Sequence, residues 1–180
     1  HVLIAGADQV SYGPPPRDRG TWRAQLVAEL NGDIDVSRVH LLGWLPFRSY
    51  LTVLQISTVH VYLSYPFILS WSLLEALSAG CLVVGSKTAP VEEVITEGEN
   101  GYLVDFFDVE SLADRVVTAA NATGQHRLRQ NARLSIVEKF DLSRVALPAY
   151  LPYYSAPWVV AAPLPRGRRP TSDSRRSSLF

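Results

Sequence analysis

The chain has 180 residues, 47% of them hydrophobic and 19% charged, and its 17 basic residues balance its 17 acidic ones. This composition suits one globular domain with a sizeable core, and we expect no nucleic-acid partner for it. No apolar run reaches the ~18 residues of a membrane-spanning helix, and no signal peptide opens the sequence. The single cysteine, Cys81, excludes an internal disulfide framework and offers no metal-ligand pair, so we expect a cytoplasmic protein.

The first half of the chain alternates between short apolar runs and segments with helical spacing. The run at 2–6 ends in Gly and predicts a buried strand, and 21–30 predicts a helix with Thr21 as its cap. A second strand is predicted at 39–43 and a second helix at 47–57.

The second half continues the same alternation. Apolar runs predict three further strands at 59–63, 81–85 and 102–106. Segments with caps or a helical period predict helices at 72–79, 90–95, 108–121 and 125–139.

Strands that alternate with helices predict an α/β fold with a doubly wound parallel sheet and helices on both faces. Ligands of such sheets bind outside the carboxyl ends of the strands. The loop at 64–71 follows the predicted strand 59–63, so we expect it at that edge.

The sequence predicts two regions of different character. Residues 1–150 form the α/β domain, and residues 151–180 form a Pro, Arg and Ser-rich tail that we expect to be disordered. The tail is either a solvated or out-of-frame segment, or a basic segment that touches anionic lipid or nucleic acid. Because the chain begins with His and contains no Met, we interpret it as a fragment cut at its N-terminus.

One carboxylate, Glu75, lies within the apolar stretch "YPFILSWSLLEALSAG". Ser72 and Glu75 have the spacing of a capping box, in which the Glu does no more than start a helix. The alternative is a ligand site. A helix N-terminus suits a phosphate, a carboxylate one turn into the helix accepts hydrogen bonds from ribose hydroxyls, and an apolar loop excludes water.

The segments "LLEALSAGCLVVGS" and "APVEEVITEGENGYLVDFFD", with "VHLLGWLPFRSYLTVLQIS" upstream, together resemble the C-terminal, donor-binding lobe of retaining GT-B glycosyltransferases of family 4, group 1. The resemblance covers about residues 2–145. It implies the Rossmann-like fold of that lobe, incomplete at its start.

The resemblance also implies roles for individual residues. In the family motif Glu-x7-Glu the second Glu binds the donor ribose, which assigns that role to Glu75. The first Glu falls at Phe67, so no catalytic residue carries over and recognition of the donor sugar is in question.

The loop after this position meets the donor diphosphate in the family through backbone N–H groups, here those of Ile68, Leu69, Ser70 and Trp71. Trp44 and Leu45 correspond to the loop beside the nucleobase, although Trp44 also reads as a packed or surface aromatic residue. Lys87 either meets a phosphate or is solvated, and Cys81 is expected in the core.

The parent protein is therefore expected to transfer a sugar from a nucleotide-diphosphate-sugar donor to an acceptor, with retention and without a bound metal or other cofactor. The acceptor lobe and the cations that neutralise the diphosphate are not part of this chain, so we expect the chain alone to be inactive. Peripheral membrane association is expected only through the parent.

The alternative function is a non-catalytic nucleotide-sugar-binding module with a degenerate motif. A sugar-nucleotide epimerase is disfavoured because "GADQVSYG" lacks G-x-G-x-x-G.

Overall fold

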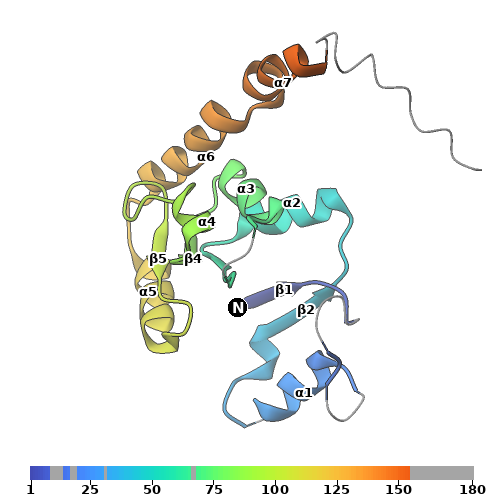
Figure 1. Cartoon of the computed structure of the whole chain (residues 1–180). Coiled ribbons are helices and arrows are strands. Elements are labelled where there is room, and N and C mark those ends of the chain that lie inside the picture. Colours follow the sequence, from blue (N-terminus) through green and yellow to red (C-terminus); the bar gives the residue numbers. More distant parts are fainter. Residues whose placement is uncertain (9–13, 17–19, 31, 66–67, 155–180) are drawn as a thin grey trace, which may run out of the picture. The chain divides into compact units, whose positions relative to one another are not determined.

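The computed structural model describes residues 1–8, 14–16, 20–30, 32–65 and 68–154. The chain divides into two compact units, residues 1–138 and residues 139–180. Strands and helices alternate along the first unit (Figure 1).

All five predicted strands are present in the described residues, and each differs from its predicted bounds by at most two residues at either end. They are β1 (Val2–Ala5), β2 (Val39–Gly43), β3 (His60–Tyr62), β4 (Val83–Ser86) and β5 (Tyr102–Val104).

The predicted helices are also confirmed, with one additional 3-10 turn. They are α1 (Trp22–Glu29), η1 (Val36–Arg38), α2 (Phe47–Ile56), α3 (Trp71–Ser78), α4 (Ala89–Glu92), α5 (Val109–Asn121) and α6 (His126–Phe140). The predicted caps form as well. The Thr21 hydroxyl accepts a hydrogen bond from the Ala24 N–H at 3.1 Å, and the Asp108 carboxylate accepts from the Ser111 N–H at 2.9 Å.

The parallel pairing is confirmed, but the described strands form two ladders where a single sheet was predicted. One ladder pairs β1 with β2, and the other has the order β3-β4-β5. Strand positions in a sequence do not specify which strand edges meet. In the described residues β1 pairs only with β2 and β3 only with β4, so one edge of each is left unpaired.

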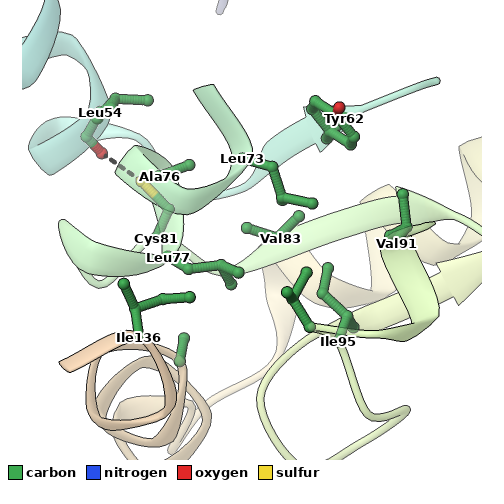
Figure 2. Packing of buried hydrophobic residues seen from close by; sticks show 12 residues of the cluster. Leu54, Tyr62, Leu73, Ala76, Leu77, Cys81, Val83, Val91, Ile95 and Ile136 are labelled. Atoms are coloured by element: carbon green, nitrogen blue, oxygen red, sulfur yellow. Dashed lines mark hydrogen bonds between the residues drawn. The ribbon is translucent and has the colours of Figure 1, made fainter. Parts of the chain in front are cut away.

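The core is built on the two faces of β4. Val83 lies in a cluster with residues of α2, α3, α4 and α6, which Figure 2 shows from close by. Leu82 and Val84 lie in the second cluster, with Ala119 of α5. Successive strand residues point to opposite faces, so β4 is covered by helices on both sides, as the doubly wound prediction requires.

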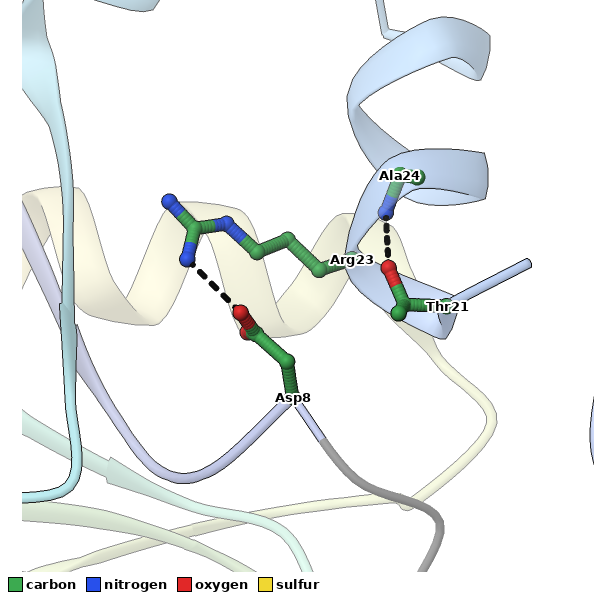
Figure 3. Close-up of polar contacts among 4 residues, drawn as sticks. All are labelled: Asp8, Thr21, Arg23 and Ala24. Carbon is green, nitrogen blue, oxygen red and sulfur yellow. Dashed lines mark hydrogen bonds and ion pairs between the residues drawn. The ribbon is translucent and has the colours of Figure 1, made fainter.

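The β1–β2 ladder carries α1 and is far less buried. All four residues of β1 are exposed, with Val2 at 53% and Ile4 at 49%. Asp8, which follows β1, pairs with Arg23 of α1 at 3.0 Å beside the Thr21 cap (Figure 3). An exposed ion pair adds little stability, and its role is to tie the end of β1 to the start of α1.

The second unit begins near the end of α6 and contains the π-helix η2 (Leu142–Ala146) and the helix α7 (Leu147–Tyr154). The Asp141 carboxylate starts η2 by accepting from the N–H groups of Ser143 and Arg144. Residues 151–154 were expected to belong to the disordered tail, and they are instead the last turn of α7. A helix that has already been nucleated upstream adds further residues at low cost, and here it continues past Pro152 although that residue has no N–H to donate. The rest of the predicted tail lies outside the described residues.

Candidate functional site

The candidate site begins where β3 and β4 end, at the carboxyl edge of their ladder. Ser86, the last residue of β4, is fully buried, and its hydroxyl both accepts from the Ser64 N–H and donates to the Ser64 carbonyl oxygen, each at 2.9 Å. Tyr62, the last residue of β3, is buried, and its hydroxyl accepts from the Ser70 N–H at 3.2 Å. The strand ends thus hold both ends of the loop that leads into α3.

Helix α3 begins one residue earlier than the sequence predicted, which changes the interpretation of Glu75. Its cap is Ser70, whose hydroxyl accepts from the Ser72 N–H at 3.3 Å. The predicted capping box is therefore wrong: Ser72 lies inside the first turn and Glu75 lies in the second. Ser70 rather than Ser72 is the cap because the backbone of Ser70 is extended, as a cap requires. Glu75 is left without the role of starting the helix.

Glu75 is half-buried and lies beside Tyr50 of α2. Burial, and then the charge of the Glu75 carboxylate, raise the pKa of Tyr50 to about 12. The Tyr50 hydroxyl oxygen is itself buried, and its nearby acceptor is Glu75, although the two do not reach full hydrogen-bonding geometry within the described part of the chain. The half-buried Glu75 carboxylate can accept hydrogen bonds from the hydroxyl groups of a ligand, while the buried Tyr50 hydroxyl interacts with Glu75 itself.

The four predicted backbone contacts surround the start of α3. Ile68 and Trp71 are 75% and 81% exposed, and Leu69 packs against the core. The Ser70 N–H is already engaged by Tyr62. The N–H groups of Ile68, Leu69 and Trp71 have no hydrogen-bond partner among the described residues, and they remain available to an anion.

Comparison with known proteins identifies the family. Residues 1–122 match the family model described as "Glycosyl transferases group 1". The chain belongs to the group 1 glycosyltransferases.

The curated and solved relatives of this glycosyltransferase chain are longer proteins. It is 30% identical over 83 residues to N-acetyl-alpha-D-glucosaminyl L-malate synthase of Bacillus anthracis, which covers 46% of the chain and 22% of that enzyme. Sucrose-phosphate synthase from Thermosynechococcus elongatus is similar at 26% identity and a TM-score of 0.65, covering 89% of the chain and 39% of that protein. Anabaena HepE, solved with UDP and glucose, is 18% identical with a TM-score of 0.65, covering 86% of the chain and 40% of HepE. The structural neighbours are GT-B glycosyltransferases, which confirms the predicted fold class.

The other predicted site residues of this glycosyltransferase chain are divided between the two ladders. Trp44, 77% exposed, and Leu45, half-buried, follow β2 of the β1–β2 ladder, while Glu75 lies in α3, between β3 and β4 of the other ladder. Lys87 is exposed at the end of β4, where its N–H donates to the Val104 carbonyl oxygen. Phe67 lies outside the described residues. Cys81 is buried in the core, as predicted.

The sequence analysis did not predict the hydroxyl groups that lie beneath the carboxyl edge of the β3-β4-β5 ladder. Tyr50 and Tyr62 reach it with hydroxyls from a helix and a strand, and Ser86 does so from the end of β4. The sequence offers one indication of them: each hydroxyl belongs to a residue at a position where the pattern of its helix or strand calls for an apolar side chain. Thr88 is a fourth such group: its hydroxyl is buried without a hydrogen-bond partner among the described residues.

The described residues contain no group of three or more His, Cys, Asp or Glu side chains arranged to hold a metal ion. No helix in the described ranges has the length and apolar character needed to cross a membrane.

Proposed function

We propose that this chain is the donor-binding lobe of a glycosyltransferase, and that it binds the nucleoside diphosphate of a sugar donor at the start of α3. The observation that carries the proposal is Glu75, a half-buried carboxylate one turn into α3, at the carboxyl edge of the β3-β4-β5 ladder. The hydroxyls of a ribose can donate to this carboxylate, and the buried Tyr50 hydroxyl lies next to it.

The diphosphate is proposed to lie against the unpartnered N–H groups of Ile68, Leu69 and Trp71. The N-terminus of α3 adds a partial positive charge there, and exposed Lys87 at the end of β4 supplies a cation at the same edge. Trp44 and Leu45 are retained as proposed contacts of the nucleobase. HepE, with the same fold, has been solved with UDP and with UDP-glucose, which supports a uridine donor as the first to try.

The parent enzyme is proposed to transfer the sugar with retention and without a metal. The acceptor oxygen forms a bond to the anomeric carbon on the face from which the phosphate departs. The acceptor proton passes to the leaving phosphate oxygen, and the nucleoside diphosphate is released. We place the parent in the cytoplasm.

We also propose that residues 1–150 are an incomplete lobe and that the chain alone transfers no sugar. The unpaired edges of β1 and β3 support this, because one further parallel strand between them would join the two ladders into a continuous sheet. The chain spans about a fifth of the curated relative and about two fifths of the solved ones named above, which leaves room for such a strand and for an acceptor lobe. Turnover of a radiolabelled donor by this chain would contradict the proposal.

The experiment that tests donor binding is a UDP titration of the chain and of Glu75→Gln by calorimetry, with GDP and ADP run in parallel. Loss of a charged hydrogen bond is expected to weaken binding by ~1–3 kcal/mol, or roughly 5- to 150-fold. Glu93→Gln is the matched control, because Glu93 is an exposed carboxylate at the C-cap of α4. Equal affinities of a folded Glu75→Gln and the unchanged chain would overturn the assignment of Glu75.

A further inference from the structure

Three aromatic rings, Tyr65, Phe106 and Phe107, form an aromatic ledge at the carboxyl edge of the β3-β4-β5 ladder. Tyr65 follows β3 and the two Phe residues follow β5, so the ledge extends across the end of the central strand β4. Each pair meets edge to face. The centroid distances are 5.6 Å for Tyr65 and Phe106, 6.0 Å for Tyr65 and Phe107, and 5.0 Å for the two Phe rings.

The ledge is fixed in place but is not part of the core. Tyr65 is 62% and Phe107 73% exposed, and neither belongs to the two buried clusters. Edge-to-face contacts hold each ring against the other two, so the exposed ring faces are presented in a set orientation. A contiguous apolar patch kept in water at a sheet edge where ligands bind indicates a binding surface.

Hydrogen-bonding groups begin directly beside the ledge. One Asp105 carboxylate oxygen accepts from the Phe107 N–H at 2.9 Å. Asp105 also lines a polar hollow of about 420 Å³ that continues along the first turns of α5. The polar groups of this hollow are those of Asp105, Asp108, Ser111, Asp114, Arg115 and Thr118.

We infer that the aromatic ledge and the polar hollow bind a neutral oligosaccharide. The less polar face of a pyranose presents C–H groups, which suit the negative face of an aromatic ring. The hydroxyls of a neighbouring sugar unit donate to the carboxylates of the hollow and accept from Thr118 and Arg115, while the Ser111 hydroxyl, which donates to Asp108 at 2.6 Å, can only accept from the sugar.

The negative charge of the polar hollow favours a neutral oligosaccharide over anionic ligands that could also pack on the aromatic ledge. The hollow holds three carboxylates and one guanidinium, and Arg115 is already paired with Glu97 at 3.2 Å. Phosphorylated, sulfated and anionic-lipid surfaces are therefore repelled, while a neutral ligand with many hydroxyls is not. If the proposed function holds, the bound oligosaccharide is the acceptor or the product of transfer, but the binding itself does not depend on that role.

The test is an NMR titration of the full chain with maltotriose and cellotriose at millimolar concentration. We expect saturable shifts, and a loss of affinity of roughly two- to tenfold in Phe107→Ala and in Tyr65→Ala. Phe107→Tyr keeps the ring and is expected to bind as the unchanged chain does. Tyr150→Ala, which removes a 63% exposed aromatic side chain of the second unit, is the matched control and should have no effect.

Several results would overturn the inference. One is a folded chain that binds neither trisaccharide, and another is an equal loss of binding in Tyr150→Ala. A third is preference for a sulfated trisaccharide or for phosphatidylglycerol vesicles.

UDP titrations of the same variants separate this inference from the proposed function. Unchanged UDP affinity in Phe107→Ala, with weaker trisaccharide binding, supports a separate sugar site. Trisaccharide binding without UDP binding would leave this inference standing while the donor site fails.

Discussion

The hydroxyl of Ser86 and the backbone of Ser64 form a reciprocal pair of hydrogen bonds, each 2.9 Å long, between the ends of two neighbouring strands. Ser86 is fully buried, so no water can replace either bond. The pair continues the β3–β4 ladder one step past its last backbone pairing and fixes the direction in which the chain leaves β3. The loop that leads to α3 and Glu75 starts from this point.

Ser86→Ala is expected to lower the free energy of unfolding by ~1–3 kcal/mol, because it leaves the partly buried N–H and carbonyl of Ser64 without their partner. It should also weaken UDP binding, since the loop before α3 loses its anchor. Denaturant unfolding and UDP calorimetry measure the two effects. Ser78→Ala is the control: this α3 side chain makes no hydrogen bond among the described residues, and a change within about 0.5 kcal/mol is expected. An unchanged UDP affinity in a folded Ser86→Ala would show that the loop is anchored elsewhere.

Arg129 of α6 forms hydrogen bonds to the carboxyl ends of two other helices, α2 and α3. Its guanidinium donates to the Gly80 carbonyl oxygen at 3.2 Å, just past α3, and to the Ser57 carbonyl oxygen at 3.3 Å, at the end of α2. It also donates to the Thr58 carbonyl oxygen. These are carbonyl groups that a helix end or its following turn leaves unpaired, and a cation there is favoured by the helix dipoles.

We therefore expect Arg129→Ala to be among the most destabilising changes of a polar residue in this chain, at about 2–4 kcal/mol. Chemical denaturation followed by circular dichroism measures it. Arg127→Ala, an exposed residue of the same helix, should change stability by less than about 0.5 kcal/mol. Similar losses in the two variants would mean that helix propensity, not the guanidinium contacts, explains the effect.

The sequence was sufficient to predict the five strands and the helices α1 to α6, because apolar runs and caps are local signals, but not η1, η2 or α7. Thr21 and Asp108 cap helices as predicted, and Cys81 lies in the core. Pairing between strands is not a local property, which is why two ladders appear where one sheet was predicted. The start of α3 was misplaced by one residue because Ser70 and Ser72 are equally good caps by composition, and only the extended backbone of Ser70 decides between them.

The candidate site was predictable only in part. Glu75 and the loop before it came from one contiguous stretch and a family resemblance. The hydroxyls of Tyr50, Tyr62 and Ser86 come from three other elements, and no spacing in the sequence connects them to Glu75. The aromatic ledge likewise joins the ends of two strands that are not adjacent in the sheet.

The last prediction concerns stability at alkaline pH. Burial raises the pKa of the Cys81 thiol from 9.0 to about 11, and burial with the nearby Glu75 charge raises that of Tyr50 from 10.0 to about 12. A group whose pKa is higher in the folded state holds its proton longer when folded. Its stabilising contribution is complete below the unfolded pKa and is lost as pH rises through the folded one. The free energy of unfolding should therefore fall from about pH 9 for Cys81 and from about pH 10 for Tyr50, until about pH 12.

Unfolding by urea at several pH values between 7 and 12 measures this loss. Cys81→Ala is expected to remove the part that begins near pH 9, and Tyr50→Phe the part that begins near pH 10. The double variant keeps every other Tyr, Lys and Arg of the chain and is therefore the reference for their titration. If its stability falls with pH as steeply as that of the unchanged chain, the two buried groups are not the cause. A smaller slope in each single variant, and a still smaller slope in the double variant, would assign the alkaline transition to Cys81 and Tyr50.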